Sequence, residues 1–337
     1  MRECPTELSR GASTMLQIKA PVTPFETSMR QTTIENEVHC SGIGLHSGIE
    51  VSMALHPAEA NTGIIFRRLD VPDNRSKIPA LFDQVIDTRL CTTLANDKGT
   101  SVSTIEHLMA ALAGCQIDNV IVTIDGSEVP IMDGSAGPFV SLIECAGIVE
   151  LGSPRNIIQI LHEVSVNEGN GRASISPTSH RRSSLNINLN IDFDNAAIGY
   201  QTLLISLSSW NFKQDICHAR TFGFLEDVEA LRQAGLAQGG SLDNAIVISG
   251  NGILNKDGLR YDDEFVRHKA LDCIGDLYLA GNQIAGCFSG YRTGHGIHNK
   301  LLRRLFADRE AWRLVPVDEL TEIRAPHWNV ESQRAIA

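Results

Sequence analysis

One stretch of the sequence, RHKALDCIGD at residues 267–276, places His268, Asp272 and Asp276 four residues apart. In an α-helix four residues slightly exceed one turn, so these side chains lie along one side of the helix and drift slowly around it. His268 and Asp272 are then close enough to hold one metal ion, although the same spacing is also common in a simple ion pair. A catalytic zinc site uses three protein ligands and one open position, so the metal hypothesis needs a third ligand.

The candidate for the third ligand is His107, in the stretch STIEHLMAALAG. A single histidine in an apolar helix is more often a core residue with satisfied hydrogen bonds. Its neighbour Glu106 favours a functional interpretation, because a carboxylate beside a metal ligand lies where a general base must take a proton from the attacking water. The sequence therefore offers a candidate set for metal-assisted hydrolysis.

A second histidine, His295, stands between two glycines in YRTGHGIHNKLL, where we expect a loop leading into the last helix. A protonated histidine at a reaction site can stabilise an oxyanion and then protonate a leaving amine. It needs a carboxylate to hold it charged and oriented, and Asp276 is the natural candidate. The nearby His298 has no obvious purpose in the sequence.

Two further stretches could line a site. Thr221 offers a hydroxyl beside Phe222 in HARTFGFLEDVEALRQAGLAQGGS, where ordinary core packing competes with an apolar groove for a chain-like ligand. The glycine-rich SGIGLHSG lacks the Gly-Lys-Ser/Thr of a phosphate-binding loop, so it predicts a hairpin whose His46 points at a site or at nothing.

The elements that position these residues alternate between strand and helix patterns. STIEHLMAALAG predicts a helix capped by Ser103 or Thr104 and closed by Gly114, and LGSPRN (151–156) is a plausible domain boundary. The stretches EHLMAALAGCQIDNVIV and RHKALDCIGDLYLAGNQIAGCF each open near a histidine, close on Ala-Gly and continue as a strand. The similarity of these two stretches favours an internal repeat of one α+β unit and a chance resemblance equally.

Composition excludes several classes of protein. The chain has 337 residues, 42% of them hydrophobic and 20% charged, with a net charge of −11, which argues against binding nucleic acid through a basic surface. Eight cysteines without a C-x-x-C pattern favour a cytosolic chain, and no apolar run reaches the length of a membrane span. Residues 1–28 lack the apolar core of a signal peptide, so we expect a flexible extension or an upstream start.

Several long motifs occur together, in one order: GIGLHSG, STIEHLMAALAG, IMDGSAGPF, ARTFGF, LRYDDEFVRHKALDCIGDLYLAG and GHGIHNKLL. From Met29 to Ala307 the chain thereby resembles the zinc-dependent UDP-3-O-acyl-N-acetylglucosamine deacetylases of lipid A biosynthesis. The resemblance implies the zinc ligands His107, His268 and Asp272, and the catalytic residues Glu106, His295, Asp276 and Thr221. It implies substrate contacts at Lys269, Phe222, Asp227, Leu90, Cys91 and His46. Iron(II) could occupy the same ligands.

The resemblance also implies the fold, an α+β arrangement of two similar two-layer sandwich domains that face each other across the active site. Domain I would span 29–150 with an insert at about 58–94. Domain II would span 151–330, with an insert at about 222–254 that forms an acyl tunnel, and 331–337 would be a loose tail. The sequence departs from the family at a lysine that contacts the substrate phosphates, where it offers Arg172 in uncertain register.

The implied reaction is zinc-dependent hydrolysis of the N-acetyl group of UDP-3-O-[(3R)-3-hydroxyacyl]-N-acetylglucosamine. It releases acetate and UDP-3-O-acyl-glucosamine, the committed step of lipid A biosynthesis. We expect a cytoplasmic monomer that binds this substrate and no nucleic acid. Two alternatives remain, a zinc hydrolase of another acetylated sugar and a nucleotide-sugar-binding protein that has lost the chemistry.

Overall fold

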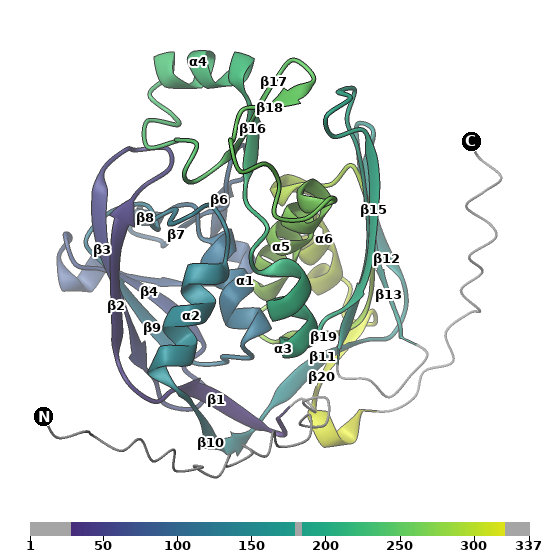
Figure 1. Ribbon diagram of the computed structural model, residues 1–337. Coiled ribbons are helices and arrows are strands. Elements are labelled where there is room, and N and C mark those ends of the chain that lie inside the picture. The colour runs from purple at the N-terminus through teal and green to yellow at the C-terminus, as the bar shows by residue number, and fades with distance from the viewer. Residues whose placement is uncertain (1–27, 179–183, 321–337) are drawn as a thin grey trace, which may run out of the picture.

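The computed structural model describes residues 28–178 and 184–320. The predicted extension at 1–28, apart from Ser28, and the tail at 331–337 lie outside the described residues. Two main sheets face each other, with helices between them (Figure 1). The α+β class is therefore confirmed, whereas the exact domain boundaries stay a prediction.

The first main sheet has the strand order β2-β3-β9-β4-β5. Its strands are β2 (Val38–Ile43), β3 (Glu50–Pro57), β9 (Val120–Ile124), β4 (Ile64–Arg68) and β5 (Lys77–Pro79). Buried and partly exposed residues alternate along β9, as expected when one face of a sheet covers a core. Helices α1 (Glu106–Gly114) and α2 (Gly137–Ala146) lie on the inner side of this sheet (Figure 1). A small sheet of β6 (Val85–Asp87), β7 (Thr93–Ala95) and β8 (Ser101–Val102) follows β5 in the chain.

The second main sheet runs β12-β13-β19-β11-β20, and β14 joins it through β19 and carries β15 on its other side. Its strands are β11 (Asn156–Ile160), β12 (Val164–Glu168), β13 (Gly171–Ser176), β14 (Leu185–Asp192), β15 (Tyr200–Ser206), β19 (Gln283–Tyr291) and β20 (Trp312–Pro316). Helices α5 (Glu264–Tyr278) and α6 (His295–Ala307) lie on its inner side (Figure 1). A short helix α3 (Ser209–Asn211) continues into one π-helical turn at Phe212–Ile216.

The remaining elements extend from or join the two sheets. β16 (Phe222–Phe224), α4 (Leu225–Gln233), β17 (Ile246–Ser249) and β18 (Gly252–Ile253) form a separate unit at the top of Figure 1. Short 3₁₀ helices lie at Asp73–Arg75, Phe82–Gln84 and Val317–Glu319. None of the helices in the described part of the chain combines the length and apolar character that crossing a bilayer requires.

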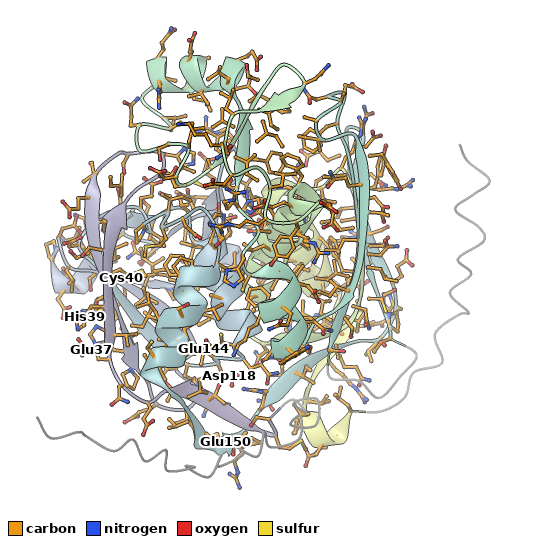
Figure 2. The ribbon with its side chains drawn as sticks, in the orientation of Figure 1. Glu37, His39, Cys40, Asp118, Glu144 and Glu150 are labelled. Atoms are coloured by element: carbon orange, nitrogen blue, oxygen red, sulfur yellow. The ribbon has the colours of Figure 1, made fainter. Side chains whose placement is uncertain are left out.

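The stretch 151–156, predicted to be a domain boundary, is mostly strand. Its first four residues belong to β10 (Ile148–Pro154), which pairs antiparallel with β1 (Arg30–Ile34) at the bottom of Figure 1, and its last residue begins β11. Arg155 follows β10 directly and is completely buried, and Figure 2 labels its partner Asp118 beside β1. The junction between the two sheets is therefore an ordered, ion-paired structure.

The helices α1 and α5 pack side by side at the centre of the molecule (Figure 1). Gly275 of α5 makes this close approach possible, because a Cβ atom there would lie 2.0 Å from the backbone oxygen of Glu106. Both helices are largely buried, which explains why their apolar residues do not follow a simple amphipathic pattern.

The predicted side-chain cap of α1 is wrong. Ile105 occupies the N-cap position and no side chain caps the helix. Thr104 has a positive φ of 55°, and its hydroxyl donates a hydrogen bond to Glu128 instead. The prediction of a loop at His295 is also corrected, because His295 is the first residue of α6.

Candidate active site

Three predicted metal ligands meet between α1 and α5. The Nε2 atoms of His107 and His268 lie 3.7 Å and 3.3 Å from Oδ1 of Asp272. One ligand atom from each of the three buried residues lies within 4.8 Å of the others, so a single ion could contact all three. The spacing of four residues on α5 supplies two ligands, and α1 supplies the third.

The partners of these side chains leave the inward-facing atoms free to bind a metal. Nδ1–H of His268 donates to the carbonyl oxygen of Ala219 at 3.1 Å, which leaves Nε2 with its lone pair. Lys269 donates to the other carboxylate oxygen of Asp272, Oδ2, at 2.7 Å. Two imidazoles and one carboxylate are the donor set of a catalytic zinc site, so the residues fit a divalent transition metal.

The ionisation states of the three residues also suit a metal. Burial, with the neighbouring His268, lowers the pKa of His107 to about 3. Burial likewise lowers the pKa of His268. Burial alone would raise the pKa of Asp272, but His268 and Lys269 hold it well below its ordinary value. The imidazoles are therefore neutral and the carboxylate charged, the forms that coordinate metals.

Glu106 lies beside His107 at the start of α1 and is 4% exposed. The backbone N–H of Thr92 donates to its Oε2 at 3.1 Å. Burial raises the pKa of Glu106 to about 7, against the opposing effect of His295, whose Nε2 lies 3.8 Å from Oε1. A carboxylate with a pKa near neutrality is suited to accept a proton and release it again.

His295 begins α6, and its Nδ1–H donates to Oδ2 of Asp276 at 2.7 Å. Burial acts to lower the pKa of His295, but Asp276 and Glu106 raise it to about 9. Burial would likewise raise the pKa of Asp276, but His295 and His298 hold it well below its ordinary value. The structure thus brings together the predicted acid and its carboxylate partner, with the acid in its charged form at neutral pH.

A cavity of about 290 Å³ joins these groups. Its lining includes the predicted residues His46, Leu90, Glu106, His107, Thr221, Phe222, His268, Lys269, Asp272 and His295. It also includes Leu45, Thr104, Phe193 and Thr293, none of which the sequence predicted as a site residue. Those four come from four separate segments, so no local pattern could have grouped them.

Thr221 is held in the cavity wall by backbone contacts. Its N–H donates to the carbonyl oxygen of Gly134, and its own carbonyl accepts from Ile246, both at 2.8 Å. Gly134 has a φ of +85°, and a Cβ atom there would lie 2.0 Å from the backbone oxygen of Asn244. The turn in IMDGSAGPF therefore positions a hydroxyl that belongs to a stretch almost ninety residues later.

His46 lines the same cavity from the β2–β3 hairpin. Both of its ring nitrogens are buried and have no hydrogen-bond partner among the described residues. Backbone N–H groups of Gln238 and Gly239 donate to the carbonyl oxygens of His46 and Leu45, at 3.2 Å and 3.1 Å. The hairpin and the loop after α4 therefore close one end of the cavity together.

Four predicted residues do not line the cavity. One is Asp276, which instead accepts a hydrogen bond from the cavity-lining His295. Cys91 is buried beside Leu90, and burial raises the pKa of its thiol to about 12. Asp227 is exposed on α4. Arg172 is exposed on β13, where its guanidinium lies 5.2 Å from the ring centre of Tyr291.

Comparisons with known proteins agree with these observations. The sequence model of a family described as LpxC: UDP-3-O-acyl N-acetylglycosamine deacetylase matches residues 31–307. A UDP-3-O-acyl-N-acetylglucosamine deacetylase of Marinobacter nauticus is 48% identical over 300 residues, which cover 88% of this chain and 96% of that protein. Proteins of the same name from Pasteurella multocida and Pseudomonas entomophila are 47% and 48% identical over 301 and 289 residues. These matches cover 89% and 85% of this chain, and 96% and 93% of those proteins.

Proposed function

Because the chain belongs to the family of UDP-3-O-acyl N-acetylglycosamine deacetylases, we propose that the cavity between α1, α5 and α6 is its active site. The enzyme hydrolyses an N-acetyl amide at the committed step of lipid A biosynthesis. The substrate is UDP-3-O-[(3R)-3-hydroxyacyl]-N-acetylglucosamine. One observation carries the proposal, namely that three metal-type ligands, a buried carboxylate and a charged histidine all face one cavity.

His107, His268 and Asp272 hold the metal, and zinc is the ion that their donor set fits, with iron(II) as the alternative. A divalent metal in this position supplies Lewis acidity, which polarises a carbonyl group and makes water a better nucleophile. Lys269 keeps Oδ2 of Asp272 occupied, so that Oδ1 faces the other two ligands.

The chain's own residues move the protons. Glu106 accepts the proton of the attacking water, since it faces the cavity beside the ligands. As the carbonyl oxygen gains negative charge, the hydroxyl of Thr221 and Nε2–H of His295 can both donate to it. The amine nitrogen then takes a proton from His295, or back from Glu106, and Asp276 keeps His295 charged before this step.

The substrate's other parts have candidate contacts around the cavity. Phe222 packs edge-on against His268, with ring centres 6.1 Å apart, and offers an apolar wall next to the metal ligands. The unpartnered ring nitrogens of His46 can pair with a polar group of the substrate. The unit of β16–β18 and α4 exposes Leu225, Leu242 and Leu254, which suits a fatty acyl chain.

The test is acetate release from UDP-3-O-acyl-N-acetylglucosamine by the metal-loaded enzyme, with the acyl chain varied from none to long. Activity that peaks at one chain length is the expected result, because an apolar passage of fixed length binds an acyl chain of the same length most favourably. Activity that does not depend on the length of the acyl chain would favour a general sugar deacetylase. Substrate binding without acetate release would favour a protein that binds the nucleotide sugar and has lost the chemistry.

The cellular setting follows the same proposal. We place the enzyme in the cytoplasm as a monomer. The cysteines in the described residues are all unpaired, as expected in a reducing compartment. Cell fractionation and the molar mass in solution would test the two statements separately.

A further inference from the structure

Asp276 has more partners than a simple pairing with His295 requires. Its Oδ1 accepts a hydrogen bond from the hydroxyl of Thr92 at 2.6 Å. Its Oδ2 accepts from Nδ1 of His295 at 2.7 Å and from Nδ1 of His298 at 2.8 Å. Two imidazoles therefore share one carboxylate oxygen, although the reaction uses only one of them.

His298 itself cannot reach the substrate. It lies on α6 one turn after His295 and is completely buried. Its ring packs edge-on against the ring of Phe288, with ring centres 5.8 Å apart. Its Nδ1 faces Asp276, and its Nε2 lies 3.0 Å from the hydroxyl of Thr293. Both ring nitrogens are satisfied inside the protein, and the residue is not part of the cavity lining.

The two histidines compete for one negative charge. The charged groups around His295 are Asp276 and Asp272 of α5 and Glu106 of α1, whereas His298 faces Asp276 but also the cations Lys269 and His295. Burial lowers the pKa of His298, whereas the pKa of His295 is raised by Asp276. His298 is therefore neutral, with its proton on Nδ1 and its Nε2 accepting from the hydroxyl of Thr293.

We propose that His298 is a positioning residue, a neutral N–H donor that orients Asp276 and withdraws part of its negative charge from His295. The inference rests on the proposed function, in which His295 must both hold a proton and release it to the leaving amine. A carboxylate that interacted with His295 alone would bind that proton more tightly. Asp276 keeps His295 charged, and His298, by sharing Oδ2, makes His295 acidic enough to release its proton.

The test compares two variants that differ only in this donor. His298→Leu removes the N–H, whereas His298→Asn replaces it with a carboxamide N–H at a similar position. In His298→Leu the alkaline limb of the pH profile of kcat should move up by about half a unit or more. Its kcat should fall about tenfold with KM within about twofold, since the residue does not touch the substrate. His298→Asn should keep the wild-type limb.

Two outcomes would overturn the proposal. One is an alkaline limb that stays in place or moves down in His298→Leu, when that variant has wild-type metal content and a wild-type unfolding midpoint. The other comes from nitrogen NMR of the histidine rings in the wild-type enzyme, which needs no variant to fold. We expect a neutral His298 with its proton on Nδ1 while His295 is charged, and the reverse assignment would refute the role. This spectrum is decisive even if no acetate is released, so it separates this inference from the proposed function.

Discussion

At the scale of single residues, burial shifts the pKa of ordinary side chains, and the charges of their neighbours decide whether each pKa rises or falls. Glu106 and Asp272 are both buried carboxylates, yet burial raises the pKa of Glu106 whereas nearby cations lower that of Asp272. One is therefore suited to exchange a proton and the other to hold a cation permanently. This difference in pKa distinguishes the proposed base from the proposed ligand more clearly than position in the sequence does.

Substituting Glu106 should separate catalysis from metal binding. Glu106→Gln should lose activity by about 10²-fold or more, because an amide cannot accept the proton of water. Metal content per chain should stay at the wild-type value, since Glu106 is not one of the three ligands. The matched variant Asp272→Ala should lose the metal itself. A metal-free Glu106→Gln enzyme would contradict the assignment of the base.

The pairing of His295 with Asp276 makes a prediction about pH. The pKa of His295 is raised to about 9, so the protonated acid, and with it activity, is present below that pH and is lost as pH rises through it. Asp276→Asn removes the charge responsible, so the alkaline limb of kcat should move down toward the ordinary histidine value of about 6.5. An unmoved limb in this variant would show that another group sets it.

The sequence could predict the residues of the site that follow a local rule or a motif. His268 and Asp272 follow helix spacing, and the structure brings them together with His107 as predicted. Thr92 contacts both Glu106 and Asp276, but nothing local predicts this, because those partners lie 14 and 184 residues away. Contacts of that kind depend on how two helices pack.

At the scale of elements, the contact between α1 and α5 sets the geometry of the proposed site, since α1 carries Glu106 and His107 and α5 carries the other two proposed ligands. The sequence predicted both helices but not the start of α1. Capping rules favour Ser103 or Thr104, whereas the Thr104 hydroxyl pairs with Glu128 and the helix begins after Ile105. A tertiary contact outweighed a local preference.

Gly275→Ala should push these helices apart. The added Cβ would meet the backbone of Glu106, which cannot rotate away as a side chain would. We expect the free energy of unfolding to fall by about 1–3 kcal/mol and activity to fall as well. Chemical unfolding and acetate release measure the two effects. Gly152→Ala is the control, because a Cβ atom there meets nothing within 4 Å, and it should change stability by less than about 0.5 kcal/mol.

At the scale of the whole molecule, a buried ion pair fastens the junction between the two halves. Arg155 donates to Asp118, to the carbonyl oxygen of Gln116 and to the hydroxyl of Thr32. The sequence stretch 151–156, which contains Arg155, is a plausible domain boundary, and that boundary stays a prediction. The structure adds that β10 pairs with β1 there, a long-range pairing that composition does not indicate.

Breaking this pair should be costly. Asp118→Ala leaves the charge of Arg155 buried without its carboxylate, so we expect a loss of about 3–5 kcal/mol in the free energy of unfolding. Asp73→Ala breaks the exposed pair with Arg67 and should leave the free energy of unfolding nearly unchanged. Equal losses in the two variants, measured by chemical unfolding, would show that burial of the pair does not matter.

The proposed metal ligands come from both halves of the molecule, His107 from α1 and the other two from α5. Coupling between two equilibria is reciprocal, so if the bound ion favours the docked arrangement of these helices, docking favours the ion to the same extent. Substitutions far from the cavity that loosen this contact would then weaken metal affinity without altering any ligand. The amount of metal retained in the presence of a competing chelator would thus measure how strongly a substitution weakens the packing between α1 and α5.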